Sequence, residues 1–538
     1  MLSKDEKRKY RSDLFRHLDG IAVAPTCYAL HKQGVLAFLL EKETVTLLEV
    51  KDHFTANEGY LNVALRILSS QGWLIQELDN ASDSIRYKIN EKSKEAFGLA
   101  YLYEDVDYLL KYSGKFSKRK FQVEPFLVLE KIMKQYKENY GQQHLRDDTV
   151  AYQVLKHIEG IIVGPTVVSL GMTGMFHKYF MESSFSADEF HSDAESFERL
   201  LDFFVWLGWF SKKGRNYSFT DVGLFFAKRA SAYGVTVSYI PTFRNLDELL
   251  FGRPGILRET KEGKDEQHVD REMNVWGSGG AHAAYFKKMD EVIIDLFNKP
   301  IAEQPKGILD MGCGNGAFLV HAFDTISTRT LRGKMLEDHP LFLVGADYNA
   351  AALRVSRANL IQANVWAKLM RGDIGDPKGL SVNLQATYNI ELEDLLNVRT
   401  FLDHNRIWSE PKNETKDSVS SSTGAFAHRG VRKNNNKVEE NLKEHFCKWM
   451  PYVKKHGLLL IELHTVDPAL VAQNLGRTAA TAYDGTHGYS DQYIVELGVF
   501  KAVAKAAGLA PVEKYASRFP DSDLATVSIN LLRGRELR

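Results

Sequence analysis

Residues 306–316 read Lys306-Gly-Ile-Leu-Asp-Met-Gly-Cys-Gly-Asn-Gly316, and this stretch decides the fold. An apolar run ends in Asp310, and glycines follow at the alternate positions Gly312, Gly314 and Gly316. The apolar run is typical of a buried parallel strand. The glycines are typical of a tight turn that lets the backbone approach a ligand. With an apolar helix expected next, the stretch predicts the strand–turn–helix unit of ligand-binding open α/β folds.

Two more apolar strands, each ending in an acid, are expected downstream. Residues 341–347 end in Asp347, and residues 367–374 carry Asp373 at the end of the strand. A carboxylate at the first position could accept hydrogen bonds from ribose hydroxyls. Asp373 could accept one from an adenine amino group. Each acid could instead cap the helix that follows it, which is common at such junctions.

The order of these residues resembles motif I and the later acids of class I S-adenosylmethionine (SAM) methyltransferases. The resemblance covers about residues 300–538 and implies a Rossmann-like α/β core with a mostly parallel, seven-stranded sheet. It also implies SAM as the cofactor. The SAM-binding residues that it implies are Asp310, Gly312, Gly314, Asn315, Gly316, Asp347, Tyr348, Asp373 and Ile374.

Composition narrows the class of protein. The 538 residues include 69 Lys and Arg and 69 Asp and Glu, so no global basic field exists to hold nucleic acid. Three widely spaced cysteines fit a reducing compartment. The charged N-terminus has no apolar signal region, and no run of 18 apolar residues appears. We therefore expect a cytoplasmic protein without a membrane span.

The first 245 residues contain an internal repeat. Arg16-His-Leu-Asp-Gly20 matches Lys156-His-Ile-Glu-Gly160 at an offset of 140. Each copy is expected to form helices followed by a short two-stranded wing, which predicts a duplicated, mainly helical winged-helix-like region. DNA binding, dimerisation into a homodimer and a scaffold role are the alternatives. The third helices, near 60–71 and 197–207, carry few Lys or Arg, which argues against DNA binding.

The predicted organisation has five parts. A Gly-rich stretch at 274–282 is either an interdomain turn or part of a lid, with a helix expected at 283–297. A fourth core strand is expected near 386–390, and a long polar insertion follows. The parts are a first winged-helix-like domain (1–110), a helical linker (111–150), a second winged-helix-like domain (151–245), a bridge or lid (246–300) and the methyltransferase domain (301–538) with insertion 409–440.

Polar residues follow the later strands of the core. Asp403 and His404 come after the fourth strand, His464 ends the fifth, and His487 and Gln492 lie further on. The carboxyl ends of parallel strands meet in one crevice, so these residues should lie near the transferred methyl group. Two histidines and an oxygen ligand are typical of catalytic Fe, Mn or Zn sites. Each histidine could instead be a hydrogen-bonded pocket residue or a general base.

Four short motifs narrow the resemblance: residues 401–406, 422–426, 461–464 and 486–492. They resemble the metal-dependent C-methyltransferases of polyketide synthase loading modules, the apratoxin type, and the α-keto-acid C-methyltransferases. The resemblance implies a divalent metal bound by His404, His464 and Gln492. It also implies an acidic substrate, which is either a small-molecule acid or an acyl group bound to a carrier protein.

The parts together predict a chemical route. A metal-chelated 1,3-dicarbonyl or 2-oxo acid loses a proton, and the enolate carbon attacks the SAM methyl group. The candidate bases are His487, Asp403 and Tyr489. Two alternatives stay open at this point. One is a metal-free O- or N-methyltransferase with winged dimerisation modules, and the other is a SAM-sensing DNA-binding regulator.

Overall fold

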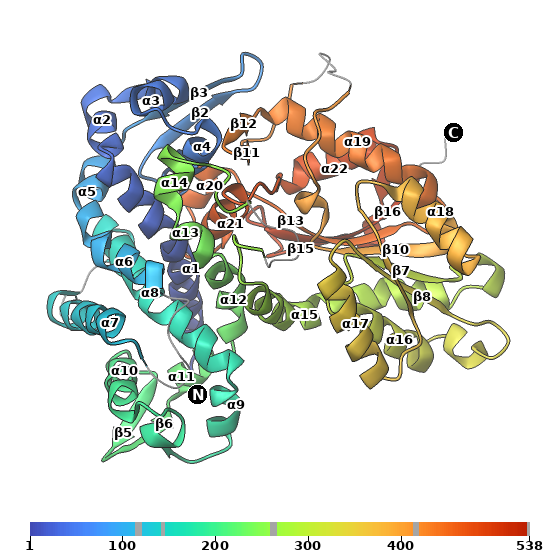
Figure 1. The fold of residues 1–538 in the computed structure, drawn as a ribbon, viewed down its shortest axis with the longest axis horizontal. Coiled ribbons are helices and arrows are strands. Elements are labelled where there is room, and N and C mark those ends of the chain that lie inside the picture. The colour runs from blue at the N-terminus through green and yellow to red at the C-terminus, as the bar shows by residue number, and fades with distance from the viewer. Residues whose placement is uncertain (113–120, 141–145, 259–265, 413–418, 535–538) are drawn as a thin grey trace.

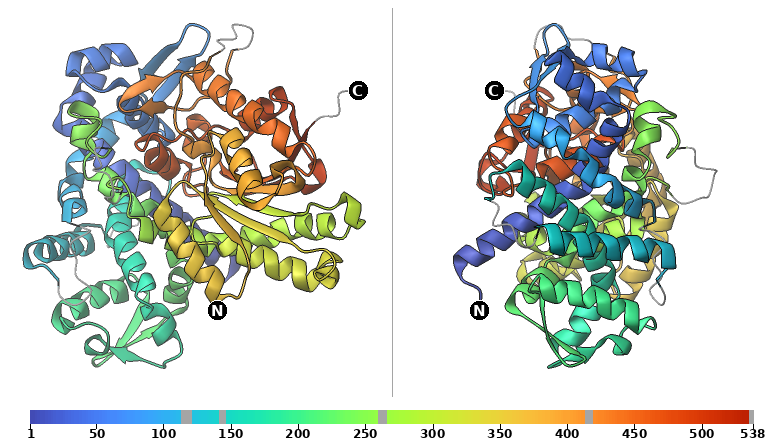
Figure 2. Two further views of the ribbon diagram at one scale, coloured as in Figure 1. Left: turned by 45° about the vertical axis from the view of Figure 1, so that its right-hand side comes forward. Right: turned by 90° about the vertical axis from the view of Figure 1, so that its left-hand side faces the viewer.

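The computed structural model describes residues 1–112, 121–140, 146–258, 266–412 and 419–534. A helical N-terminal region lies beside an α/β core, and the long helix α15 (Arg271–Phe297) joins them (Figure 1). The first turns of α1 project from the rest of the molecule (Figure 2). The basic and aromatic stretch at 113–120 of the predicted linker lies outside the described residues.

The first repeat forms helices around a small antiparallel sheet. Its longest helix begins at a capping box, in which Ser3 and Glu6 satisfy each other's backbone amides. The sheet has the order β1-β3-β2, so the predicted two-stranded wing has a third strand. The elements are α1 (Lys4–Lys32), α2 (Val35–Lys42), β1 (Thr44–Thr46), α3 (Leu47–Phe54), α4 (Glu58–Ser70), β2 (Ile75–Asp79), β3 (Ser84–Lys88), α5 (Ser93–Gly98), α6 (Glu104–Tyr112) and α7 (Val123–Gln135).

The second repeat has the same plan. Its sheet has the order β4-β6-β5, which corresponds to β1-β3-β2 of the first copy. The duplicated, mainly helical winged-helix-like region is confirmed. The elements are α8 (Val150–Met172), α9 (Met175–Phe180), β4 (Phe185–Ser186), α10 (Ala194–Trp206), β5 (Phe210–Lys213), β6 (Asn216–Phe219), α11 (Asp221–Ala227), α12 (Ala230–Ser238), α13 (Ile240–Phe243) and α14 (Leu246–Phe251).

The equivalent helices of the two copies, α1 and α8, pack directly against each other. They cross at the repeated glycines. A Cβ atom on Gly160 would lie 2.6 Å from Cα of His17, and a Cβ on Gly20 would overlap the backbone of His157. Only glycine permits this approach, so the repeat is also the contact between the copies.

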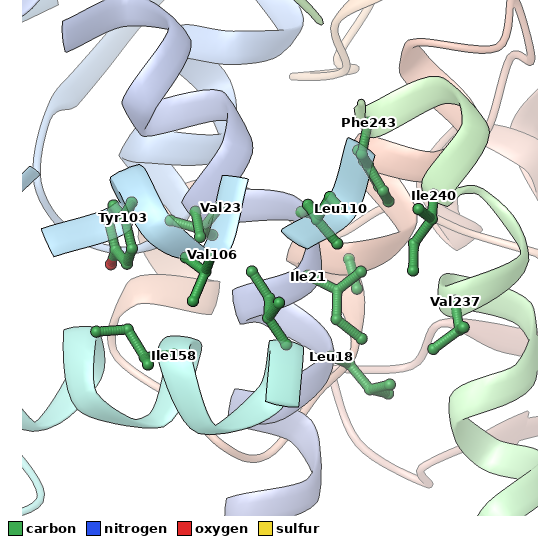
Figure 3. Close-up of a cluster of buried hydrophobic side chains, with 14 of the residues drawn as sticks. Leu18, Ile21, Val23, Tyr103, Val106, Leu110, Ile158, Val237, Ile240 and Phe243 are labelled. Carbon is green, nitrogen blue, oxygen red and sulfur yellow. The ribbon is translucent and has the colours of Figure 1, made fainter. Parts of the chain in front are cut away.

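Helix α8 is buried in this contact. By length and composition alone it is apolar enough to cross a membrane, but 72% of its most apolar window is buried inside the protein. Figure 3 shows Ile158 of α8 near Val106 of α6, with Leu18 and Ile21 of α1 and Val237 of α12 in the same cluster. This is the environment of a core helix.

Helix α15 corrects the prediction for the bridge. Residues 274–282 form no turn, because the helix runs without interruption through Gly277, Gly279 and Gly280. A Cβ atom on Gly277 would lie 2.6 Å from the backbone of Gly234 in α12. The glycines therefore permit a close crossing of two helices. In a sequence, glycines with this packing role look the same as glycines that mark a turn.

The core sheet has the order β14-β16-β13-β10-β7-β8-β9, and β15 also pairs with β16. The five strands from β13 to β9 are parallel, and β16 runs antiparallel to β13. This confirms a mostly parallel Rossmann-like sheet and adds one short strand. The strands are β7 (Gly307–Met311), β8 (Phe342–Asp347), β9 (Lys368–Arg371), β10 (Leu395–Thr400), β13 (Leu458–Leu463), β14 (Leu509–Pro511), β15 (Ser517–Phe519) and β16 (Val527–Gly534).

The fourth core strand was predicted in the wrong place. Residues 386–388 end a helix, Asn389 follows with a φ of 55°, and the strand begins at Leu395. A short apolar run is compatible with a helix or a strand, and here these residues form a helix. The core helices are α16 (Ala317–Arg329), α17 (Ala350–Gln362), α18 (Pro377–Tyr388), α19 (Asn435–Val453), α20 (Pro468–Ala472), α21 (Ala480–Gly488) and α22 (Leu497–Ala506).

Within the polar insertion, β11 (Phe426–His428) and β12 (Val431–Lys433) form a hairpin. Both strands pack on α4 of the first repeat. Twelve of the thirteen residues of α4 are buried, from Gly59 to Ser70. Helix α4 therefore has no free face with which to enter a DNA groove.

Candidate active site

The glycine loop, residues 310–316, joins β7 to α16. Gly312, Gly314 and Gly316 have φ of 78°, 54° and 78°, a region that side chains disfavour. A Cβ atom on Gly312 would also lie 2.8 Å from the Leu402 side chain. The loop therefore requires glycine for both its conformation and its packing.

Asp310 lies beneath this loop and is 1% exposed. Its Oδ1 atom has no hydrogen-bond partner among the described residues. Burial, together with the nearby carboxylate of Asp347, raises the pKa of Asp310 to about 8. A buried, unpaired carboxyl oxygen calls for a donor, and the ammonium group of an amino-acid ligand would provide one.

Asp347 holds the glycine loop and Asp373 stabilises the turn after β9, and neither caps a helix. Asp347 accepts the backbone N–H of Gly314 at 3.0 Å, and Asp373 accepts that of Gly375 at 2.7 Å. The N-cap residues of the three helices are instead Gly316, Asn349 and Asp376. The alternative that the acids are N-caps is therefore wrong.

The remaining predicted cofactor residues lie around the same edge. The carbonyl of the buried Ile374 accepts the indole N–H of Trp449 at 2.7 Å. Tyr348 is exposed, and the guanidinium of Arg371 lies 5.0 Å from the centre of its ring. Asn315 accepts the N–H of Ala317 at 3.1 Å. The structure thus brings all the predicted cofactor residues to the carboxyl ends of β7, β8 and β9.

His404 follows β10 and is held by a buried carboxylate. Its Nδ1–H donates to Glu462 of β13, which also accepts the backbone N–H groups of Asp403 and Leu463 at 2.9 and 2.7 Å. Since Nδ1 carries the proton, the neutral imidazole leaves Nε2 as an acceptor. Leu402, two residues before His404, packs its side chain against Gly312 of the glycine loop.

His487 of α21 is the second histidine of this group. Its ring centre lies 5.1 Å from that of His404. Its Nδ1 lies 2.8 Å from the Thr486 hydroxyl and 2.9 Å from the carbonyl of Tyr483; a carbonyl can only accept, so Nδ1 donates and Nε2 is left as the acceptor. Burial, with a smaller effect of His404, lowers the pKa of His487 to about 3, so the ring is neutral near pH 7.

Tyr239 joins this group from the N-terminal region. Its hydroxyl accepts a hydrogen bond from Nε2 of Gln492 at 2.9 Å, and its ring centre lies 6.0 Å from that of His487. Burial raises the pKa of Tyr239, so the phenol keeps its proton. Having accepted from the amide, the hydroxyl can donate that proton to a ligand.

We call His404, His487, Gln492 and Tyr239 the acceptor cluster. No sequence signal marks Tyr239, which lies over 160 residues before the other members and within no motif. Glu462 was also missed, although it lies in the quoted stretch 461–464. An acid two residues before a candidate ligand histidine, on the same side of the strand, was the available signal.

His464 does not belong to the cluster. Its Nδ1 donates to the carbonyl of Val495 at 3.1 Å, and its Nε2 is paired with the Ser528 hydroxyl at 2.7 Å. Both ring nitrogens are used inside the fold, so none is free for a metal. The prediction of His464 as a ligand is corrected: the residue beside His404 is His487.

Two of the three predicted bases are also corrected. Asp403 forms buried ion pairs with Arg399 and His445, and although burial opposes its ionisation these partners lower its pKa to about 2. Tyr489 packs in the core of the N-terminal region, where its hydroxyl pairs with Thr26 at 3.1 Å. Both side chains are engaged in structural contacts, Asp403 in ion pairs and Tyr489 in a hydrogen bond.

Arg66 of α4 ties the two parts of the protein together behind the cluster. It is buried, and it donates to Asp484 of α21 at 2.9 Å and to Thr465 and Val466 after β13 at 2.9 and 2.8 Å. Helix α21 carries His487, and β13 carries Glu462. The first repeat therefore helps to position both histidines of the acceptor cluster.

Family models match most of the chain. One described as "AprA MT2-like domain" matches residues 266–530, "AprA winged helix domain" matches 159–253, and "AprA N-terminal domain" matches 10–76. No curated protein matches significantly. Among described residues, no group of three or more His, Cys, Asp or Glu could hold a metal ion.

Several solved structures are similar in fold. LepI in complex with SAM has 13% identity and a TM-score of 0.38, with 82% of this chain and 100% of that chain covered. The O-methyltransferase NcsB1 from neocarzinostatin biosynthesis, solved with SAM, has 15% identity and a TM-score of 0.35, with 69% of this chain and 95% of that chain covered. The CurJ carbon methyltransferase has 11% identity and a TM-score of 0.33, with 70% of this chain and 92% of that chain covered. These likenesses are too distant to transfer a substrate or a residue role.

Proposed function

Because the chain is a class I SAM-dependent methyltransferase related to AprA, we propose that it methylates carbon in an enolisable acid or acyl thioester, malonyl-like or 2-oxo-acid-like, in polyketide-type secondary metabolism. The observation that carries the proposal is the pair of imidazoles 5.1 Å apart, His404 and His487. The Nδ1 atom of each is tied to the protein, and each keeps Nε2 for a ligand. His404 follows Leu402 by two residues, and the Leu402 side chain packs against Gly312 of the glycine loop.

The donor side follows from the loop chemistry. Asp310 would bind the SAM ammonium group, and Asp347 and Asp373 would face the ribose and the adenine. The closely packed glycines would hold the sulfonium methyl toward His404. Orienting donor and acceptor in this way accounts for much of the barrier reduction in group transfer.

The acceptor cluster fits a divalent ion better than a protein base. A pKa of about 3 makes His487 too weak a base for efficient proton abstraction near pH 7, whereas a neutral imidazole is what a metal needs. A carboxylate and a backbone carbonyl on the two Nδ1 atoms are the usual outer partners of ligand histidines. His404, His487 and the Gln492 amide oxygen would hold Fe, Mn or Zn. When bound, such an ion supplies Lewis-acid polarisation of the acceptor's carbonyl group.

The protein's own groups complete the acceptor side. The Tyr239 phenol would donate to the enolate oxygen as negative charge develops there, since its proton is retained. Gln492 fixes the position of that hydroxyl. Arg66 holds α21 and the end of β13 in register, so the two imidazoles keep their spacing.

One observation favours a second candidate, a metal-free O-methyltransferase. The pairing of His404 with the Glu462 carboxylate is also the arrangement of a general base with an orienting acid. In this alternative His404 would take the proton of a substrate hydroxyl, and His487 would only shape the pocket.

The experiment that separates the two uses ¹³C-methyl SAM with malonate-type and 2-oxo acids. We expect the label on carbon, stoichiometric metal in protein purified without chelator, and a rate that chelation abolishes. His404→Asn and His487→Asn should each lower the rate by about 100-fold or more. Label on oxygen together with a chelator-insensitive rate would establish the metal-free alternative instead.

A further inference from the structure

A ligand-sized cavity lies at the edge of the core sheet opposite to the glycine loop. It has a volume of about 320 Å³, and Lys306, Arg332, Phe342 and Lys455 are among its lining residues. Lys306 and Phe342 stand at the amino ends of β7 and β8, whereas the glycine loop follows the carboxyl end of β7. Five strand residues separate the two edges by about 16 Å. The volume is at the lower end of the range for metabolite pockets.

Arg332 is a buried cation without a carboxylate partner among the described residues. It is 4% exposed, and its four hydrogen bonds go to the carbonyls of residues 306, 339 and 340 and to the amide oxygen of Gln304, all neutral groups. A guanidinium has five N–H donors, so one N–H of Arg332, which lines the cavity, has no partner in these four bonds. Burial lowers the pKa of Arg332, which is the cost of an uncompensated charge.

Two lysines add to this positive charge. Lys306 and Lys455 share a single carboxylate, Asp394, which Lys306 contacts at 2.7 Å. Both lysine side chains are about half exposed or more, so their remaining N–H donors can reach a ligand. Among the described residues that line the cavity, Asp338 is the only one with a carboxylate. Three cations against one lining carboxylate and one shared carboxylate leave the cavity positively charged.

We propose that this cavity binds a small organic anion with two or more negative charges, a phosphate ester or a polycarboxylate. Lys306, Lys455 and the free N–H of Arg332 would bind the charged groups through charge-assisted hydrogen bonds. The half-exposed ring of Phe342 would contact the apolar part of the ligand. The site is independent of methyl transfer, because the sheet separates it from the glycine loop.

The test is calorimetric titration of the full-length chain at constant ionic strength. Pyrophosphate and citrate are the two probes, and sodium chloride is the reference salt. We expect one saturable site per chain for at least one probe. The preferred probe identifies the source of the charge, phosphate or carboxylate. The double variant Lys306→Gln/Lys455→Gln should weaken that binding by about 10-fold or more and leave SAM affinity within about twofold of wild type.

Two controls keep the result interpretable. Lys7→Gln/Lys94→Gln removes the same charge from exposed positions of the helical region and should leave the affinity unchanged. Asp394→Asn frees both lysines and should tighten binding, an effect that damage to the fold would not produce. No saturable heat with wild type, an equal loss in the control variant or weaker binding by Asp394→Asn would each overturn the proposal.

Discussion

The two halves of the carboxyl edge of the core sheet are built in different ways. The cofactor half, at β7, β8 and β9, takes its residues from positions 310–374, one short stretch of chain. The acceptor half takes Tyr239 from the second repeat, His404 from the end of β10, His487 from α21 and Gln492 from the loop after it. Arg66 of the first repeat holds α21 in place. One half is a local supersecondary unit, and the other exists only after distant segments have packed.

This difference predicts which function, cofactor binding or the acceptor cluster, a substitution should affect. Changes in the glycine loop should remove cofactor binding while the acceptor cluster keeps its contacts. Changes in the N-terminal region should do the reverse, because α1, α4 and α12 contact α21, which carries His487. Each of the following predictions tests this separation.

The largest effect is expected from Gly312→Val. The substitution places a Cβ at a φ of 78° and 2.8 Å from Leu402, so the loop must move. We expect SAM affinity to fall by about 100-fold or more, measured by calorimetry. Gly508→Val is the matched control, since Gly508 also has a positive φ, of 85°, but the nearest atom to its Cβ position is 3.9 Å away. It should cost stability and leave SAM affinity intact, and equal losses in the two variants would refute the prediction.

The second prediction concerns pH and the cofactor half. With a pKa of about 8, Asp310 of the free protein is protonated at pH 6 and must lose its proton to pair with the SAM ammonium. SAM affinity should therefore rise by about 10-fold per pH unit from pH 6 toward pH 8 and level off above it. Asp310→Asn should bind weakly at every pH. A flat pH profile in wild type would show that Asp310 is already ionised.

The third prediction tests the contribution of the helical region to the acceptor half. Tyr239→Phe removes one donor from the cluster and should lower kcat by about 10- to 100-fold, with SAM affinity within about twofold. Tyr489→Phe is the control, because among the described residues its hydroxyl forms a hydrogen bond with Thr26 alone, in the helical core. Its kcat should stay close to wild type. If the control lost as much activity as Tyr239→Phe, the result would contradict the assignment of Tyr239 alone to the acceptor cluster.

The smallest effect is expected from Arg66→Lys. A lysine keeps the charge next to Asp484 but cannot reproduce the guanidinium's simultaneous bonds to α21 and to the residues after β13. We expect the acceptor KM to rise about two- to fivefold and the free energy of unfolding to fall by about 1–2 kcal/mol. Steady-state kinetics and denaturant titration measure these changes. A rise in the Kd for SAM instead would contradict the separation of the two halves.

The cofactor half was predictable because its signals are local. A strand of apolar residues, glycines at alternate positions and an acid at the end of each strand are all consequences of short-range geometry, so they can be read in order along the chain. The repeat at 16–36 and 156–176 was visible for the same reason, since two copies of one unit keep one pattern. Even here, residues 386–388 misled, because a short apolar run fits a helix as well as a strand.

The acceptor half shows what the sequence left open. Residue types near strand ends predicted a polar cluster with His404, His487 and Gln492 in it. They did not separate His464, whose two nitrogens are both bonded within the fold, from His487, whose Nε2 is free for a ligand. Nor did they show that Arg399 and His445 form ion pairs with the carboxylate of Asp403.

Sequence alone thus determined the fold class, the duplication and the cofactor loop, because propensity, patterning and glycine conformation act over a few residues. Tertiary structure alone decided which histidines pair, which acids are neutralised and that Tyr239 joins the cluster. Those outcomes depend on contacts between segments far apart in the chain, such as Tyr239 with Gln492, 253 residues apart, and Arg66 with Asp484, 418 residues apart. A hydrogen bond takes up a donor or an acceptor only once the chain has folded, and what remains free is the chemistry of the site.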